Sequence, residues 1–339
     1  MGSINKDCLN TIRLLAALQV VWNHVSWHLS LSGAGTYAIS KFLGFFHGIP
    51  IFFTLSGFCI WMSIGRSKSF GQYAQKRFYR IYPELWVAVF IEIVALLILF
   101  KGIINWPQLG VFAIGQATIF PFWVPDFLRE YGCGVPNGAL WSIFALMQFY
   151  ALAYPMYKIL HGRSLKRWSV SVGVLVFLSI VFKFQGHYLP INLEKLMAIS
   201  FVPTFWMFMV GALVAEYKDQ LLPVIIRFWY VPVVVRVIAI WVQVPELPTF
   251  NYGFLHTLMC FLAALALAYK LPFMNVRADI SYGVYIYHMT VVNAMISLGF
   301  VGGGVDRYLI CVIITSVLAY FSHKTIGIWA TKKKMTLIK

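Results

Sequence analysis

The sequence predicts an all-α polytopic membrane protein. Of its 339 residues, 60% are hydrophobic and only 11% are charged, and the mean hydropathy is +0.78. Soluble domains carry roughly a quarter charged residues, so this composition excludes an ordinary soluble fold. The apolar residues fall in runs of about 20, the length that a helix needs to cross a bilayer. We therefore expect a single transmembrane domain over residues 1–339, with no separate soluble domain.

The apolar runs predict about ten transmembrane helices. Their expected ranges are 9–29, 42–63, 81–100, 138–160, 168–185, 196–215, 224–243, 253–270, 279–300 and 307–324. The first run follows no basic region with a cleavage motif, so it reads as a retained span. An eleventh run, 107–123, is short, is interrupted by glycine and is closed by Pro121 and Pro125.

The basic residues predict the orientation of these helices. Ten crossings put both termini on one side, and 20 of the 27 Lys and Arg residues then fall on that side. Because Lys and Arg collect in cytoplasmic loops, both termini are expected to be cytoplasmic. A full crossing at 107–123 would move the later basic clusters outside, so this run is expected to be re-entrant or interfacial. The net charge of +16 then needs no nucleic-acid partner.

The cysteines predict neither a disulfide framework nor a zinc site. They lie far apart along the chain and form no CxxC pair. The five positions are Cys8, Cys59, Cys133, Cys260 and Cys311. No metal is expected.

Within the first apolar run, the stretch RLLAALQVVWNH (13–24) has an ionisable residue at each end, Arg13 and His24. Eleven residues at 100° per residue return to within about 20°, so both side chains share one helix face, roughly 16 Å apart along the axis. If Arg13 is near the cytoplasmic boundary, His24 lies near the middle of the ~30 Å core. A structural interpretation remains open, in which Arg13 extends to the interface and His24 forms an interhelical hydrogen bond. The functional one is that both line a reaction site.

The next two motifs are weaker on their own. In IPIFFTLSGFCI (49–60), Ser56 and Gly57 form a small pair that lets helices pack closely. In KRFYRIYPELW (76–86), Arg77 and Arg80 share a face where a helix enters the membrane, and Lys76 adds positive potential. Guanidinium groups suit phosphate oxygens, so this stretch contacts either lipid headgroups or a soluble polyanion such as a nucleotide-bearing cofactor.

Further polar residues lie inside later apolar runs. The stretch 137–155 carries Trp141, Ser142, Gln148 and Tyr150, and 279–289 begins with Asp279 and includes His288. An aromatic belt explains the tyrosines of this last stretch but not His288.

The third span contains the only carboxylate deep inside an apolar run, Glu92. Arg236, also within a predicted span, is its possible partner.

Taken together and in order, these stretches resemble the integral-membrane acyltransferase-3 family, which includes bacterial and bacteriophage O-antigen acetyltransferases. The resemblance covers nearly the whole chain. It rests on Arg13 with His24, on Phe52 to Phe58, on Arg77 to Pro83, on Trp141 to Pro155 and on Ser281 to His288. One position departs from the pattern: many relatives have a glutamate five residues after the tryptophan, where this chain has Leu146.

The resemblance implies transfer of an acetyl group from cytoplasmic acetyl-CoA to a hydroxyl of a surface polysaccharide, such as a lipid-linked or O-antigen glycan, in the bacterial inner membrane. His24 would act as general base or carry the acetyl group itself. Asn23 and Ser56 would orient the imidazole or stabilise the oxyanion, and Asp279 or His288 would hold the other ring nitrogen. Arg13 is assigned to the same catalytic set.

The donor would be held by Lys76, Arg77, Arg80, Trp141 and Tyr150. Two alternatives stay open. One is a transporter or flippase of a glycan or acyl intermediate, which would not depend on a cytoplasmic acyl donor. The other is an acyltransferase that uses a succinyl or longer acyl donor.

Overall fold

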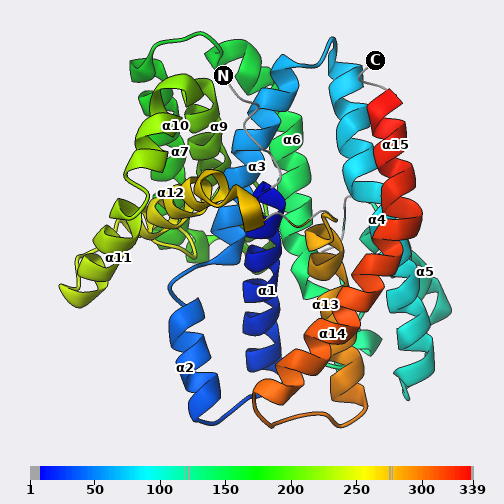
Figure 1. The fold of residues 1–339 in the computed structure, drawn as a ribbon. Helices are drawn as coiled ribbons and strands as arrows, with labels where there is room; N and C mark the ends of the chain where they lie inside the picture. The colour runs from blue at the N-terminus through cyan, green and yellow to red at the C-terminus, as the bar shows by residue number, and fades with distance from the viewer. Residues whose placement is uncertain (1–7, 119, 121–122, 275, 277, 337–339) are drawn as a thin grey trace. The chain divides into compact units, whose positions relative to one another are not determined.

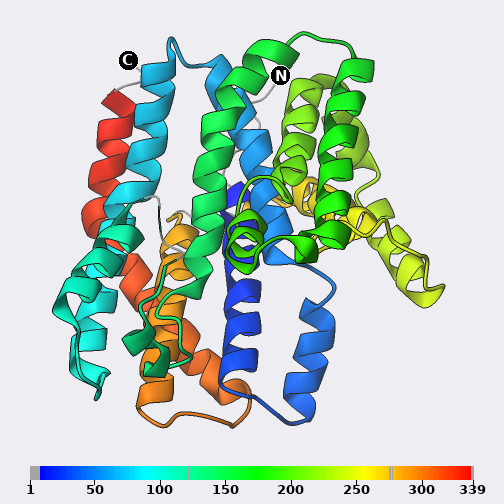
Figure 2. The ribbon, with the colours of Figure 1, turned by 180° about the vertical axis from the view of Figure 1, so that it is seen from behind.

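The computed structural model describes residues 8–118, 120, 123–274, 276 and 278–336, and these residues form no β-strand. The long helices are α1 (Cys8–His28), α3 (Gly48–Gly65), α4 (Phe70–Leu99), α6 (Trp141–Leu160), α7 (Leu165–Gln185), α12 (Phe254–Lys270), α13 (Ser281–Ser297) and α14 (Val305–Ser322). The shorter ones are α2 (Ala34–Leu43), α5 (Trp106–Ala117), α8 (Ile191–Ala198), α9 (Phe205–Glu216), α10 (Lys218–Arg227), α11 (Val231–Trp241) and α15 (Ile328–Thr336). Figures 1 and 2 show these helices from opposite sides.

The chain forms two compact units whose segments alternate along the sequence. Unit 1 comprises residues 1–13, 49–73 and 145–277, and unit 2 comprises residues 14–48, 74–144 and 278–339. Helices α1, α3, α4 and α6 therefore each contribute residues to both units.

Unit 1 is built on a very close crossing of α3 and α9. A Cβ atom added at Gly57 would lie 1.8 Å from the carbonyl oxygen of Phe208, and one at Gly211 would lie 1.8 Å from that of Thr54. Each glycine thus meets the other helix's backbone, as expected for small residues at a membrane helix interface. Phe149 of α6 packs beside this crossing, with its ring centroid 4.9 Å from that of Phe53.

A single carboxylate, that of Glu216, joins several helices of unit 1. Glu216, the last residue of α9, accepts hydrogen bonds from Trp61 Nε1 (2.6 Å), His161 Nδ1 (3.0 Å) and the backbone nitrogen of Gly162 (2.6 Å). These donors come from α3 and from the connection between α6 and α7, so one side chain ties three helices together.

Unit 2 is organised around α13, of which most residues are buried. Helix α14 runs beside it, and the two helices meet where a Cβ on Gly283 would be 2.8 Å from the Cβ of Ala319. Both views show this pair (Figures 1 and 2). A second apolar cluster joins α4, α5 and the short 3₁₀ helix η1 (Asp126–Glu130) through Leu96, Phe112 and Leu128.

The helices follow the apolar runs, but several details differ from the expected spans; the run 196–215, for example, is interrupted, and α9 begins only at Phe205. Helix α4 begins at Phe70 rather than 81, because the Ser69 side chain accepts a hydrogen bond from the backbone nitrogen of Gln72 and caps the helix. The run 224–243 is broken, since α10 and α11 meet at an angle of 66°. The run 42–63 is preceded by α2, which the apolar pattern did not separate from it.

Five described helical segments are long and apolar enough to cross a membrane, or six if the bent α10–α11 pair counts as one span. The expected ten crossings stay a prediction. Helix α5 has twelve residues, about 18 Å, which is shorter than the ~30 Å hydrocarbon core. Pro121, expected to close that run, lies outside the described residues.

Candidate active site

Helix α1 carries both Arg13 and His24. It is continuous from Cys8 to His28, so Arg13 and His24 do share one helix face. Both side chains are half-buried. In unit 1, Arg13 donates to Asn10 Oδ1 (3.3 Å) and contacts Cys59 Sγ on α3 at 3.1 Å.

Three imidazole rings meet in unit 2. The ring of His24 lies parallel to that of His28, one turn further along α1, with centroids 5.6 Å apart. The ring of His288 on α13 lies on another side, with its centroid 5.0 Å from that of His24 and the planes tilted by 47°. Of the two groups expected beside His24, His288 is therefore in ring contact with it.

The orientation of His288 is fixed by its own helix. Its Nδ1 lies 2.6 Å from the carbonyl oxygen of Tyr285. A carbonyl only accepts, so in the neutral ring the proton is on Nδ1 and the lone pair is on Nε2. His288 is fully buried, and its Nε2 has no hydrogen-bond partner among the described residues. A buried ring nitrogen with a free lone pair is a functional candidate because burying it without a partner is costly.

Tyr285 links this histidine to the start of α6. Its hydroxyl lies 2.6 Å from the Ser142 hydroxyl and donates to the carbonyl oxygen of Ala139 (3.0 Å). The motif residues from 137–155 and 281–288 are thus in direct contact, although they are distant in sequence.

A second buried polar pair lies near the same part of α13. Asn137 donates through Nδ2 to the carbonyl oxygen of Ile286 (3.0 Å) and to Glu92 Oε2 (3.4 Å). Both side chains are buried, and Glu92 Oε1 and Asn137 Oδ1 have no hydrogen-bond partner among the described residues. Arg236, the suggested partner of Glu92, binds Glu246 Oε1 at 2.9 Å within unit 1.

The segment before Asn137 is held by Asn293, which sequence reasoning did not single out. Asn293 is fully buried; its Oδ1 accepts from the backbone nitrogen of Cys133 (2.7 Å), and its Nδ2 is shared among the carbonyl oxygens of Val135, Pro136 and Met289. His28 was also missed, although its i+4 spacing from His24 was visible in the sequence.

The expected donor-binding cations lie on α4. Lys76 is buried, whereas Arg77 and Arg80 are half-buried. Arg80 Nη2 lies 2.8 Å from Asp279 Oδ2, and Asp279 Oδ1 also accepts from Ser281. Asp279 therefore pairs with Arg80, which leaves His288 as the expected neighbour of His24.

The other expected site residues are distributed over both units. In unit 2, Asn23 is exposed and Trp141 is half-buried. In unit 1, Ser56 is half-buried, and the carbonyl oxygen of Tyr150 accepts a hydrogen bond from the Tyr73 hydroxyl (2.9 Å). Among the described residues, no group of three or more His, Cys, Asp or Glu side chains is placed to hold a metal ion.

Comparison with known families decides the class of this protein. The model of the acyltransferase domain of the acyltransferase-3 family matches residues 6–324, which includes every motif described above. The chain belongs to this family. This acyltransferase thus has its family domain distributed over both compact units, with the His24–His288 contact in unit 2.

Two relatives are similar to this acyltransferase over most of its length. Nodulation protein 10 of Rhizobium leguminosarum bv. viciae is 29% identical over 329 residues, which cover 89% of this chain and 87% of the relative. An O-acetyl transferase of Shigella phage Sf6 is 27% identical over 312 residues, 86% of each protein. No solved structure matches the acyltransferase.

Proposed function

We propose that this protein is a membrane O-acetyltransferase that moves an acetyl group from cytoplasmic acetyl-CoA to a hydroxyl of a surface polysaccharide sugar. The observation that carries the proposal is the contact between His24 and the buried His288, in a chain similar to a phage O-acetyl transferase. The proposed setting is the bacterial inner membrane, with ten crossings and both termini in the cytoplasm.

In the proposed reaction His24 acts as a general base. It takes the proton of the acceptor hydroxyl while the hydroxyl oxygen attacks the thioester carbon; the C–S bond then breaks, and the imidazolium returns the proton to the leaving thiolate. His288 is assigned as a positioning residue, because its ring lies against that of His24 and its anchored Nδ1 leaves the buried Nε2 unprotonated.

A covalent relay through His24 is the second form of the same function. Here a ring nitrogen of His24 attacks the thioester, carries the acetyl group and passes it to the hydroxyl. Single-turnover labelling with ¹⁴C-acetyl-CoA and no acceptor separates the forms: only the relay leaves label on the protein, and His24→Ala removes it.

The cations of α4 are proposed to hold the phosphates of the donor. Arg80 Nη2 binds the Asp279 carboxylate at 2.8 Å, and this affinity for an anionic oxygen supports the proposal. Lys76 and Arg77 lie on the same helix and in the same unit. Trp141, Tyr150 and Arg13 remain proposed donor-site or catalytic residues, as do Asn23 and Ser56 for the oxyanion.

The test is a comparison of His24→Ala with His28→Ala. Both remove an imidazole from the same face of α1, but only His24 contacts His288. Loss of a general base lowers kcat by about 10²–10⁴, so we expect His24→Ala to insert normally and lose transfer while His28→Ala keeps most of it.

The readout is mass spectrometry of surface polysaccharide from cells expressing each variant, which detects one added acetyl group per repeat unit. Normal acetylation by a well-expressed His24→Ala protein would refute the site. Acetylation that persists in membranes without acetyl-CoA would refute the donor and would favour a transporter.

A further inference from the structure

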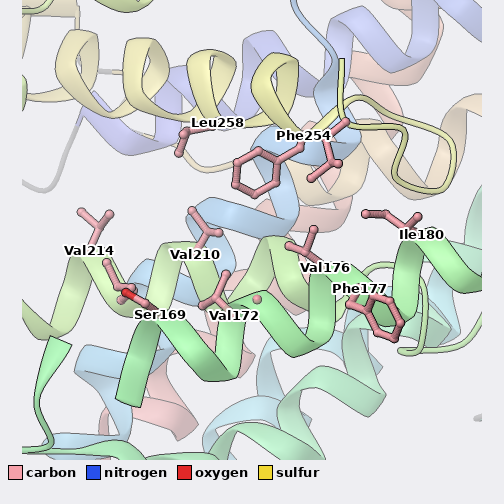
Figure 3. A pocket seen from close by; sticks show the side chains of 12 residues that line it. Ser169, Val172, Val176, Phe177, Ile180, Val210, Val214, Phe254 and Leu258 are labelled. Atoms are coloured by element: carbon pink, nitrogen blue, oxygen red, sulfur yellow. The ribbon is translucent and has the colours of Figure 1, made fainter. Parts of the chain in front are cut away.

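An open apolar groove lies in unit 1, and none of the motif residues discussed so far lines it. It has a volume of about 550 Å³, within the range of small-molecule sites. Its floor and walls come from α7, α9 and α12 (Figure 3). Val210 and Val214 of α9 face α7 across the groove, and Phe254 and Leu258 of α12 cover it from the other side.

The α7 side of the groove is one stripe of the helix. Its residues recur at spacings of three and four, so they share a face. They are Ser169, Val172, Gly173, Val176, Phe177 and Ile180. The stripe is about 16 Å long, which is about half of the ~30 Å hydrocarbon core and therefore the depth of one leaflet.

Gly173 keeps this groove open. It is exposed in the middle of α7, and a Cβ atom added there would meet nothing within 4 Å. Helix packing therefore does not require glycine, although glycine inside a helix costs about 0.5–1 kcal/mol relative to alanine. A side chain at this position would project into the space that the groove now offers.

The two ends of the groove differ. At the far end, the Ser179 hydroxyl donates to the carbonyl oxygen of Pro203 and accepts from the backbone nitrogen of Phe250. These two hydrogen bonds join α7 to the segments before α9 and before α12. At the near end, the stripe continues to Lys166, three residues before Ser169, beside Arg167. Both cations are exposed, and neither forms an ion pair within the described part of the chain.

We propose that this groove binds one anionic phospholipid. Its phosphate contacts Lys166 and Arg167, and one acyl chain lies along the stripe from Ser169 to Ile180. A basic rim on an apolar groove between membrane helices is the arrangement that binds anionic headgroups. The groove's length matches a chain of one leaflet, and its single polar lining residue, Ser169, lies at the headgroup end.

A lipid-linked glycan has the same two chemical parts, a phosphate and a hydrocarbon chain. Under the proposed orientation the loop that carries Lys166 is cytoplasmic, whereas the proposed acceptor is modified on the outer side. This places the phosphate site in the cytoplasmic leaflet, whereas a glycan modified on the outer side has its phosphate in the outer leaflet, and so favours a phospholipid as the occupant.

Native mass spectrometry of the full-length protein in detergent tests the proposal. Palmitoyl-oleoyl phosphatidylglycerol and the corresponding phosphatidylcholine are added separately, and the fraction of protein that retains one lipid is measured. We expect phosphatidylglycerol to bind about tenfold more tightly, because each Lys or Arg near a headgroup strengthens the attraction. The Lys166→Gln, Arg167→Gln double variant should lose this preference.

Gly173→Leu fills the groove and should reduce retained phosphatidylglycerol about tenfold. Val174→Phe is the matched control, because it adds similar bulk at the adjacent position, which is exposed but does not line the groove. Melting temperatures show that each variant is folded. The proposal is overturned if Gly173→Leu binds like the wild type, if both lipids bind equally, or if the protein purified from membranes carries an isoprenoid phosphate instead.

Discussion

Replacing Asn293 by leucine should destabilise the protein and its reaction site together. Leucine has nearly the same size but cannot form hydrogen bonds, and Asn293 is fully buried on α13. Its amide joins α13 to the segment 133–136 through one accepted bond of 2.7 Å and donated bonds of 2.7 and 3.1 Å. This segment leads directly to Asn137, which is bonded to Glu92.

The magnitude follows from the bonds that are lost. Asn293 provides one acceptor and two amide hydrogens, so three hydrogen bonds disappear, each contributing about 1 kcal/mol net. The Pro136 carbonyl left behind is buried and the Cys133 and Val135 groups are partly buried, which raises the loss to about 3–5 kcal/mol. For a protein of this size, such a change lowers the melting temperature by on the order of 10 °C.

Thermal unfolding of the purified protein in detergent measures this change, and transfer assays below the melting temperature measure the site. Thr315→Val is the control, since it removes a fully buried hydroxyl in the same unit whose contact to Cys311 Sγ is long, at 3.9 Å. It should change the melting temperature little. The reasoning is refuted if Asn293→Leu melts within a few degrees of the wild type.

Three further predictions concern packing, donor binding and pH. Gly57→Ala should lower the free energy of unfolding by about 1–3 kcal/mol or more, because the added Cβ would lie 1.8 Å from the Phe208 carbonyl oxygen. An unchanged melting temperature would contradict the close crossing of α3 and α9. Arg80→Gln should raise the KM for acetyl-CoA about tenfold with kcat nearly unchanged, and equal KM values would exclude it from the donor site. Burial acts to raise the pKa of Glu216, but its three hydrogen-bond donors hold this pKa below the ordinary 4.5. The ionised Glu216 therefore stabilises the folded protein above pH 4.5, and this contribution is lost as the pH falls through the lowered pKa. Glu216→Gln should therefore lower the melting temperature at pH 7 but not in strong acid.

Hydropathy predicted the approximate positions of the helices well, but it predicted their first residues and their bends less well. The run starting at 81 marks the apolar part of α4, but backbone hydrogen bonding continues back to Phe70, through polar and basic residues that lower the hydropathy without ending the helix. The bend between α10 and α11 falls between Pro223 and Pro232, so the sequence contained a signal for it. A hydropathy average over about 20 residues does not detect a bend of this kind.

The candidate site divides in the same way. Placing Arg13 and His24 on one face needed only helical periodicity, and the helix α1 confirms it. The contact between His24 and His288 joins helices from opposite ends of the chain, so no local pattern could reveal it. Arg236, suggested as a partner for Glu92, forms an ion pair within its own unit with Glu246, ten residues away, a local pair that the sequence argument did not consider.

Helix α13 combines the fold of unit 2 with its chemistry. Gly283 lets α14 approach, Tyr285 bonds to Ser142, His288 contacts His24, and Asn293 holds the segment before Asn137. These contacts leave the helix in several directions, so its position is determined from all of them at once. A fixed backbone also fixes the Tyr285 carbonyl that orients His288, which is how an imidazole can be held buried with one nitrogen unpaired despite the cost. In the proposed mechanism, the contacts that stabilise unit 2 also preorganise the histidine pair for transfer.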